Sequence, residues 1–175
     1  MAQQIIKLEK YIRDIPDWPV KGVLFRDITP LLADAEALAQ AVKMMSSDFI
    51  DRQIEYVAAV EARGFIFGAA IAGRLGAGFV PIRKKGKLPF KTKSVSYDLE
   101  YGVDTLEVHS DAVKKNAKVL LVDDLLATGG TMSAAAKLIE KVGGQVVGMT
   151  FLIELSFLRG RERISQYPIK TVICY

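Results

Sequence analysis

The chain has 175 residues and half of them are hydrophobic, which is enough for one domain with a sizeable core. Its net charge of +4 is modest, so it favours small anionic ligands at least as well as nucleic acid. The single cysteine, Cys174, excludes an intramolecular disulfide and a metal site built from several cysteines. The sequence has no recognisable targeting segment and no apolar run of membrane-spanning length, so we expect a cytoplasmic protein without a membrane partner.

The N-terminal part carries apolar residues where a surface loop would be polar. Apolar residues at helical spacing predict a short helix over residues 5–12, which the bond before Pro16 ends. Residues 16–30 are expected to be irregular, and their apolar side chains suggest a flap that covers something. Within this flap Phe25 either stacks on a flat base or anchors the loop to the core, and the residues alone leave both readings open.

Helices and strands then alternate. The expected elements are a helix over 38–49 with Asp34 capping its start, a strand over 56–60, a helix over 65–75 and a strand over 78–82. The small residues of the second helix would let it pack closely on a sheet. Arg63, at the junction between strand and helix, either meets an anion at the helix N-terminus or pairs with Glu61 at the surface.

A dense basic block follows the strand over 78–82. Residues 83–93 hold six cations and no acid. Such runs are usually solvated or touch nucleic acid, but a basic loop at a strand end also suits a polyanion such as pyrophosphate. Residues 94–97 and 105–108 then alternate as the strands of a hairpin. Glu100, in the connection, is either a general acid–base placed by loop closure or an exposed turn acid.

The most informative stretch runs from Val119 to Thr131. Four apolar residues predict a buried parallel strand, and Asp123 and Asp124 stand at its carboxyl end. The loop after them is made of small residues, so its backbone N–H groups can approach a phosphate, and the helix expected over 132–142 adds the partial positive charge of its N-terminus. Two acids would repel a bare phosphate. They are therefore expected to face sugar hydroxyls or a metal, which together with the loop predicts a sugar phosphate as ligand.

The rest of the chain continues the alternation, with a strand over 146–152, a short charged helix over 156–164 and an edge strand over 169–174. His109 is the only histidine, which excludes a pair of catalytic histidines, and we expect it at the surface at a strand end. The pattern predicts an α/β protein with a mainly parallel sheet and its ligand at the carboxyl ends of the strands. No linker or repeat divides residues 1–175, so a single domain is expected.

The thirteen-residue stretch from Val119 to Thr131 closely resembles the phosphoribosyl-diphosphate-binding motif of the type I phosphoribosyltransferases, in the form that the adenine phosphoribosyltransferases carry. The segments 22–27, 61–64 and 96–102 are similar to further strings of that family. The resemblance implies the type I phosphoribosyltransferase fold, a mainly parallel central sheet flanked by helices. A small N-terminal helix and hood would occupy about residues 1–33, and a flexible basic loop and β-hairpin about residues 83–110.

The resemblance also implies a reaction and its residues. The 5-phosphoribosyl group would pass from phosphoribosyl diphosphate to adenine, giving AMP and pyrophosphate in purine salvage. Adenine would stack on Phe25, with the backbone of Leu24 and Arg26 reading its edge. Glu100 would handle the proton, and Arg63 would oppose charge on the leaving group. The implied contacts to phosphoribosyl diphosphate are Arg63, Arg83, Lys84, Lys87, Asp123, Asp124, Ala127, Thr128, Gly129, Gly130 and Thr131.

In this family magnesium travels on the diphosphate, so no direct protein ligand for Mg²⁺ is expected. The resemblance further implies a homodimer, in which some basic residues reach across the interface. Two alternatives remain at this point: a related enzyme for another purine base, and a regulator that senses phosphoribosyl diphosphate while binding nucleic acid through the basic block. The regulator is disfavoured because the chain has no room for an added DNA-binding domain, and because Glu100 would have no function in a regulator.

Overall fold

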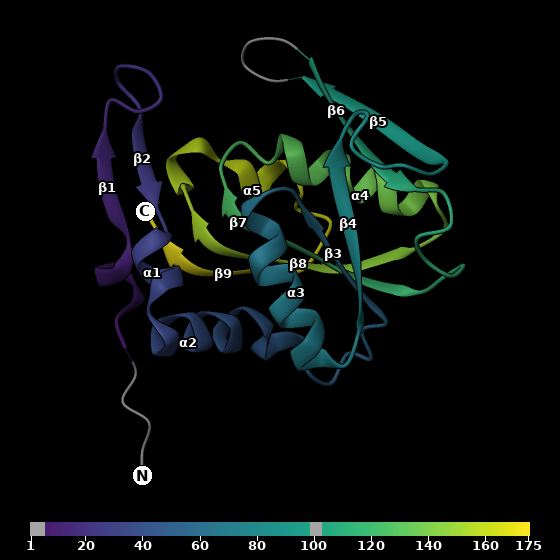
Figure 1. The fold of residues 1–175 in the computed structure, drawn as a ribbon, viewed down its shortest axis with the longest axis horizontal. Helices are drawn as coiled ribbons and strands as arrows, with labels where there is room; N and C mark the ends of the chain where they lie inside the picture. The colour runs from purple at the N-terminus through teal and green to yellow at the C-terminus, as the bar shows by residue number, and fades with distance from the viewer. Residues whose placement is uncertain (1–5, 99–102) are drawn as a thin grey trace. The chain divides into compact units, whose positions relative to one another are not determined.

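The computed structural model describes residues 6–98 and 103–175. Contacts between residues divide the chain into two compact units, one up to Met44 and one from Met45 (Figure 1). The N-terminal unit is therefore longer than the hood expected over about residues 1–33, and a single domain over 1–175 stays a prediction. None of the helices in the described ranges is long and apolar enough to cross a membrane.

The N-terminal unit differs from the expected helix and irregular flap. Its elements are the 3₁₀ helix η1 (Leu8–Tyr11), the strands β1 (Arg13–Pro16) and β2 (Leu24–Asp27), and the helices α1 (Thr29–Ala33) and α2 (Ala35–Ser46). The helix expected over 5–12 is wrong in extent, and residues 16–30 are not irregular throughout. β1 and β2 pair antiparallel, with Arg13 opposite Asp27. Within residues 6–12 only the 3₁₀ helix η1 forms, because an α-helix this short is marginal without tertiary support, and the strand pairing lies in residues 13–27.

The turn between β1 and β2 is held by its own residues. Asp17 and Gly22 both have positive φ, and the Gly22 N–H donates to Asp17 Oδ1 at 2.7 Å. Further along, the Ala37 N–H donates to Asp34 Oδ1 at 2.9 Å, which confirms Asp34 as the cap of α2. The helix expected over 38–49 corresponds to α2 and the following 3₁₀ turn η2 (Ser47–Phe49).

The unit from Met45 onward is built on a mixed sheet. Its described residues form seven strands in the order β5-β6-β4-β3-β7-β8-β9. Neighbours from β4 to β9 run parallel, while β6 is antiparallel to both β4 and β5, so the expected mainly parallel sheet is confirmed. The strands are β3 (Tyr56–Val60), β4 (Gly78–Lys84), β5 (Thr92–Asp98), β6 (Val103–His109), β7 (Lys118–Leu126), β8 (Gln145–Glu154) and β9 (Ile169–Cys174).

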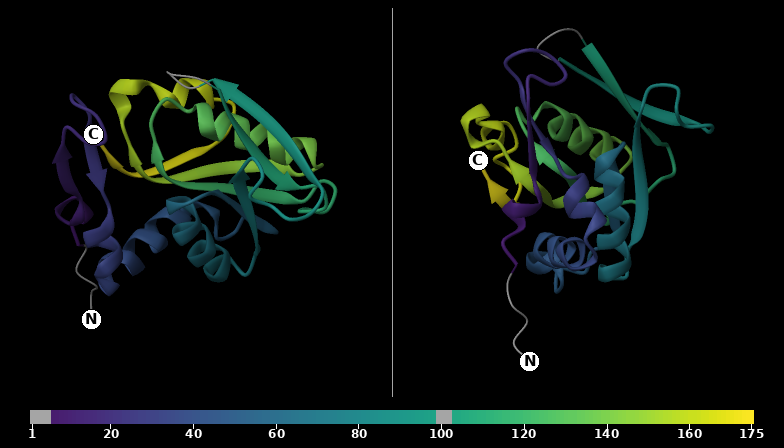
Figure 2. Two further views of the ribbon diagram at one scale, coloured as in Figure 1. Left: turned by 45° about the horizontal axis from the view of Figure 1, so that its top comes forward. Right: turned by 60° about the vertical axis from the view of Figure 1, so that its left-hand side comes forward.

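Two helices cover opposite faces of this sheet. α3 (Arg63–Leu75) connects β3 to β4, and α4 (Gly130–Lys141) connects β7 to β8, and the views show them on opposite sides (Figures 1 and 2). The connections therefore run outward from the β3–β7 pair, from β3 to β4 on one side and from β7 to β8 on the other. A crevice at the carboxyl ends of such a strand pair is where open α/β sheets bind ligands. Asp123 lies just beyond Val122, the last residue of β7 that is paired with β3, and Arg63 begins the helix after β3.

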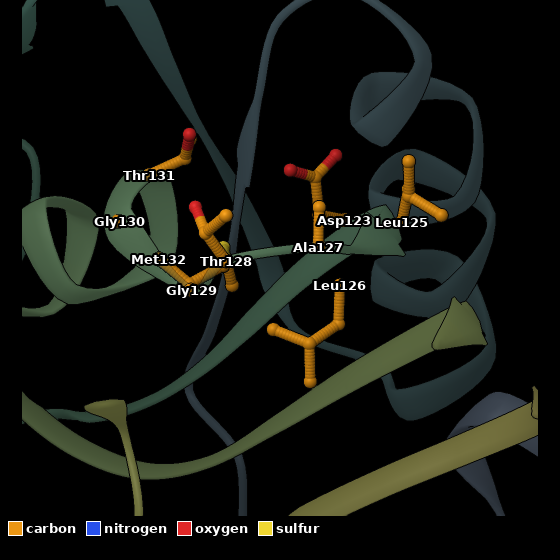
Figure 3. Close-up of a pocket in the computed structure, with 9 residues that line it drawn as sticks. All are labelled: Asp123, Leu125, Leu126, Ala127, Thr128, Gly129, Gly130, Thr131 and Met132. Atoms are coloured by element: carbon orange, nitrogen blue, oxygen red, sulfur yellow. The ribbon is translucent and has the colours of Figure 1, made fainter. Parts of the chain in front are cut away.

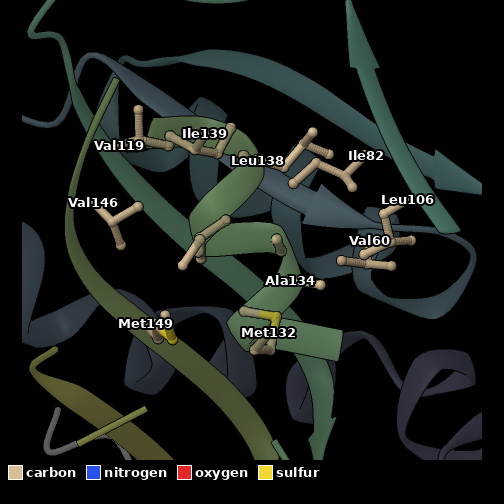
Figure 4. Packing of buried hydrophobic residues seen from close by; sticks show 14 of the residues in the cluster. Val60, Ile82, Leu106, Val119, Met132, Ala134, Leu138, Ile139, Val146 and Met149 are labelled. Carbon is tan, nitrogen blue, oxygen red and sulfur yellow. The ribbon is translucent and has the colours of Figure 1, made fainter. Parts of the chain in front are cut away.

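A large cluster of buried residues lies between α4 and the sheet. Met132, Leu138 and Ile139 of α4 are buried, and Figure 4 shows Leu138 beside Ile82 and Ile139 beside Val119. All four apolar residues from Val119 to Val122 are fully buried, as predicted for a central parallel strand. Burying an aliphatic side chain of this size contributes about 1.5–3 kcal/mol. This packing fixes the ends of β7 and α4, and so fixes the loop between them.

Two further expectations need correction. The charged helix expected over 156–164 is instead the 3₁₀ turn η3 (Ser156–Leu158) and the short α5 (Gly160–Arg163), because Arg159 between them has a φ of 53° and breaks the helical path. His109 does end a strand, but it is only half-exposed, and its ring meets Phe90 edge-on at 6.1 Å. The edge position of β9 is confirmed.

Candidate active site

The two acids at the end of β7 have different surroundings. β7 runs on to Leu126, so both acids lie within the strand and their side chains leave on opposite faces. Asp123 is partly exposed, and its Oδ1 accepts the Asp124 N–H at 2.9 Å. Asp124 is buried, and its Oδ2 lies 2.9 Å from Nε of Arg63. Asp124 thus pairs with Arg63 while Asp123 does not, and the expectation that both acids face the ligand stays a prediction.

Close packing of these acids raises their pKa values. Desolvation raises the pKa of Asp123 well above its ordinary value, and the neighbouring charge of Asp124 raises it further. Desolvation also raises the pKa of Asp124, although the Arg63 guanidinium opposes that shift. A donor or cation brought next to Asp123 would relieve this cost, so the site is prepared for a hydroxyl-rich or cationic partner.

The loop after β7 surrounds a small hollow. Gly129 has a φ of 78°, which lets the chain turn into α4 with Gly130 as its first residue. In Figure 3 the hydroxyls of Thr128 and Thr131 and the carboxylate of Asp123 lie on one side of the loop, and Leu126 points to the other. The lining residues are Asp123, Leu125, Leu126, Ala127, Thr128, Gly129, Gly130, Thr131 and Met132. A helix N-terminus with small residues and hydroxyls is suited to bind a phosphate.

The first turn of α3 lies directly on the end of β7. A Cβ on the buried Gly64 would come within 2.8 Å of Asp123 Oδ1 and 3.3 Å of the Val122 carbonyl oxygen. Glycine is therefore needed here for close approach. The helix begins at Arg63, two residues before the expected start, so the arginine that pairs with Asp124 lies in its first turn.

Glu61 pairs with Arg83 and not with Arg63. Its Oε2 accepts Nε and Nη2 of Arg83 at 3.0 and 2.8 Å, and its Oε1 accepts the Lys84 N–H at 2.7 Å. Burial alone would raise the pKa of Glu61, but the bonds from Lys84 and Arg83 outweigh it and lower that pKa. The alternative reading, an Arg63–Glu61 surface pair, is wrong. Arg83 also donates to the carbonyl of Lys87, whose own side chain is exposed.

The hairpin of β5 and β6 is linked to residues 127–131, the loop after β7 that we call the phosphate loop. The Thr131 hydroxyl donates to the Tyr97 hydroxyl at 3.4 Å, and Tyr97 in turn donates to Asp104 Oδ2 at 3.4 Å. Lys84 Nζ lies 3.2 Å from the same Asp104 oxygen. Burial raises the pKa of Tyr97, so it stays a neutral donor. The hairpin, the basic strand end and the start of α4 therefore share one polar chain.

The residues expected to bind adenine lie in β2 of the N-terminal unit. Phe25 meets Trp18 edge-on with the ring centroids 4.4 Å apart, and Arg26 pairs with Asp14. Leu24 is exposed. Because Leu24 and Arg26 are two apart in a strand, their backbone groups point to the same edge. That edge arrangement is what reading one side of a flat base requires.

The structure brings together part of the expected site. Asp123 and residues 127–131 share one hollow, while Arg63 and Asp124 lie beside it. Arg83 and Lys84 have acidic partners of their own, and Glu100 lies outside the described residues. Sequence reasoning missed Glu61, Gly64 and Tyr97 as parts of this region. The one available signal was the glycine after Arg63, since a small residue at a helix start permits close packing on a strand.

Comparison with known proteins adds an independent finding. The phosphoribosyl transferase domain family matches residues 28–173. A Natranaerobius thermophilus protein named adenine phosphoribosyltransferase is 56% identical over 168 residues, covering 96% of this chain and 98% of its own length. The crystal structure of adenine phosphoribosyltransferase from Thermoanaerobacter pseudethanolicus has a TM-score of 0.93 at 52% identity, with 96% of this chain and 98% of that one covered.

A more distant structure carries ligands. It is the adenine phosphoribosyl transferase of Trypanosoma brucei in complex with AMP, pyrophosphate and ribose-5-phosphate. Its TM-score is 0.82 at 27% identity, and the match covers 96% of this chain and 78% of that one.

Proposed function

This chain belongs to the adenine phosphoribosyltransferases of the phosphoribosyl transferase family, and we propose that it transfers the 5-phosphoribosyl group of phosphoribosyl diphosphate to adenine. The products would be AMP and pyrophosphate, which makes the reaction a step of purine salvage. The observation that carries the proposal within this structure is the hollow at the end of β7, where one carboxylate lies beside a phosphate-type loop.

Each half of a ribose 5-phosphate has a matching partner in this hollow. The N–H groups at the start of α4, with the hydroxyls of Thr128 and Thr131, suit the 5-phosphate. Asp123, which lies on the same side, suits the ribose hydroxyls, because an ionised carboxylate only accepts hydrogen bonds. It also suits the positive charge that develops on the ribose ring as the C1–O bond breaks. No group in the hollow repels such a ligand once its hydroxyls face the acid.

The leaving diphosphate gains negative charge in the same step. Arg63, in the first turn of α3, is held by Asp124 and supplies a fixed positive group where that charge grows. Because Arg63 is oriented beforehand, little reorganisation is needed at the moment of reaction. We propose that Arg83, Lys84 and Lys87 extend this positive region, with Arg83 oriented by Glu61.

The base and its proton require two other parts of the chain. Phe25 offers a ring for stacking on adenine, and backbone groups of Leu24 and Arg26 would read the edge of the base. Glu100 is the proposed acid–base group, and its placement rests on the family resemblance. Since Tyr97 ties the same hairpin to Thr131, phosphate binding and placement of Glu100 would be coupled.

Magnesium fits this site as a companion of the substrate. Mg²⁺ keeps several waters and is usually bound through one or two carboxylates together with substrate phosphates. Asp123 is the partly exposed carboxylate of the hollow, and its raised pKa reflects a charge that a cation would stabilise. When bound, the ion would neutralise charge on the diphosphate.

We further propose that the protein acts as a homodimer in the cytoplasm. Ile66 on α3 and Phe79 on β4 are large apolar side chains that are 42% and 37% exposed, and Phe79 contacts Phe65 edge-on at 5.5 Å. An exposed apolar cluster of this kind suits a second copy of the chain. The one cysteine is a free thiol, which is typical of a reducing compartment.

The test is AMP formation from each purine base in turn, with phosphoribosyl diphosphate and Mg²⁺. The proposal requires adenine to be the preferred base by a wide margin. A preference for guanine or hypoxanthine would favour the related enzyme for another base. Binding of phosphoribosyl diphosphate without turnover of any base would favour a sensor. Asp123→Asn in the same assay links the reaction to the hollow, since it should lower turnover in every case that uses this site.

A further inference from the structure

The phosphate loop is backed by a turn that does not line the hollow. A Cβ on Gly160 would come within 2.0 Å of the Ala127 carbonyl oxygen and 2.9 Å of the Gly129 nitrogen. The contact is reciprocal, because a Cβ on Gly129 would lie 2.4 Å from the Gly160 carbonyl oxygen. Two glycines about thirty residues apart thus bring the backbones of the loop and of α5 into direct contact, closer than any side chain permits.

The α5 side of this contact is fixed. Arg161, the next residue, donates from Nε and Nη2 to the two carboxylate oxygens of buried Glu154 at 3.1 and 2.6 Å, and Nη2 also donates to Thr171 Oγ1 at 3.2 Å. The hydrogen bonds from Arg161 lower the pKa of Glu154, so this pair stays charged at neutral pH. Ile164, just after α5, is fully buried. The turn is therefore anchored to β8 and β9.

The loop side of the contact has less support. Leu126 before it and Met132 after it are buried, but Ala127 is only partly buried and Thr128 is exposed. The same loop lines the hollow (Figure 3). If the two backbones are pushed apart, we expect the loop to move more than the anchored turn. Such a movement would change the shape of the hollow.

We propose that Gly160 is a positioning residue for the 5-phosphate: through its contact with Ala127 and Gly129 it sets the depth of the phosphate loop. This inference rests on the proposed function of the hollow. It assigns a role to a turn outside the binding motif. It also separates binding of the 5-phosphate from binding of the diphosphate, which the proposed function assigns to Arg63 and the basic residues from Arg83 on.

The experiment compares the Gly160→Ala variant with the unsubstituted protein by titration calorimetry. One titration uses ribose 5-phosphate and the other uses Mg²⁺-pyrophosphate. Ribose 5-phosphate should bind roughly tenfold more weakly to the variant, within the range that overpacking of a backbone contact produces. The affinity for pyrophosphate should change by no more than roughly twofold, because the strain acts on the phosphate loop and not on the residues assigned to pyrophosphate. Gly73→Ala is the matched control, because its Cβ would meet nothing within 4 Å, and it should alter neither affinity.

Equal weakening of both ligands, or no weakening of either, would overturn the proposal, since a merely structural glycine would not separate them. Should Gly160→Ala fail to fold, Arg161→Lys keeps the glycine but loses the two-pronged bond to Glu154, and the same split between the two ligands is required of it. The proposed function is judged separately by turnover of the unmodified protein with adenine. A protein that binds ribose 5-phosphate but forms no AMP would contradict the function and leave the Gly160 test intact.

Discussion

The packing of α3 on β7 predicts the cost of one methyl group at Gly64. In Gly64→Ala the new Cβ would lie 2.8 Å from Asp123 Oδ1 and 3.3 Å from the Val122 carbonyl oxygen. The carboxylate can rotate away, but only by losing its bond from the Asp124 N–H. The carbonyl belongs to Val122, which is fully buried in the sheet, so relief there requires the helix to shift. Overpacking of this kind costs about 1–3 kcal/mol.

Gly73→Ala provides the control within the same helix. Its Cβ would have no neighbour within 4 Å, so the substitution should stabilise the protein by about 0.5–1 kcal/mol through helix propensity alone. The two variants should then differ in stability by about 1.5–4 kcal/mol, and therefore in midpoint of thermal unfolding by about 3–16 °C, at about 2–4 °C per kcal/mol for a chain of this size. Calorimetry without ligand measures this difference.

Activity provides a second measurement on the same pair. One response to the methyl group at Gly64 moves the Asp123 carboxylate, and the other moves α3 together with Arg63. Gly64→Ala should therefore also lose AMP formation, whereas Gly73→Ala should keep it. Equal melting temperatures for the two variants would refute the packing argument. A stable Gly64→Ala with full activity would refute the role given to Asp123.

The remaining predictions concern the charge, proton, base and assembly of the site. Asp123→Asn should weaken the binding of phosphoribosyl diphosphate by about 1.5–3 kcal/mol, measured in a binding titration. Because the pKa of Asp123 is raised in the folded state, its ionisation destabilises that state as pH rises from the unfolded pKa through the folded one, so Asp123→Asn should melt higher than the parent at neutral pH and equal to it in acid. An unchanged melting temperature at neutral pH would contradict this. Glu100→Gln should slow single-turnover AMP formation by roughly 10²–10⁴ with substrate affinities retained, and normal turnover would remove its acid–base role. Phe25→Ala should mainly weaken adenine binding, by about 1–3 kcal/mol, and an unchanged affinity would show that the ring only packs within its own unit. Solution scattering should report a dimer, and a fully active monomer would exclude a shared site.

The sequence predicted the main sheet well because its strands have unambiguous composition. Val119 to Val122 reads as a buried strand from its residues alone, and the buried core confirms it. The N-terminal helix was the main error. The expected helix over 5–12 is reduced to a 3₁₀ helix over Leu8–Tyr11, because two turns of α-helix are marginal without tertiary support. Residues 13–27, expected to be partly irregular, form a hairpin closed by Asp17 and Gly22. Tertiary pairing of this kind leaves little trace in a single short segment.

The features of the candidate site that depend on residue type could be predicted from the sequence. The features that depend on contacts between distant residues could not. Two acids before a loop of small residues indicate a sugar phosphate, because carboxylates accept hydrogen bonds from hydroxyls and such a loop suits a phosphate. The sequence does not show that Asp124 pairs with Arg63, that Glu61 pairs with Arg83, or that Asp123 lines the hollow. Ion-pair partners twenty or more residues apart are decided by the crossing of strands and helices. For the same reason Gly160 gave no signal, since its partner lies about thirty residues earlier.

A crystal structure of the protein with AMP tests the central claim most directly. We expect the 5-phosphate within hydrogen-bond distance of the backbone N–H groups of Gly129, Gly130 and Thr131, with the ribose hydroxyls on Asp123. A phosphate held instead by Arg83 and Lys84, with Asp123 free of the ribose, would contradict it.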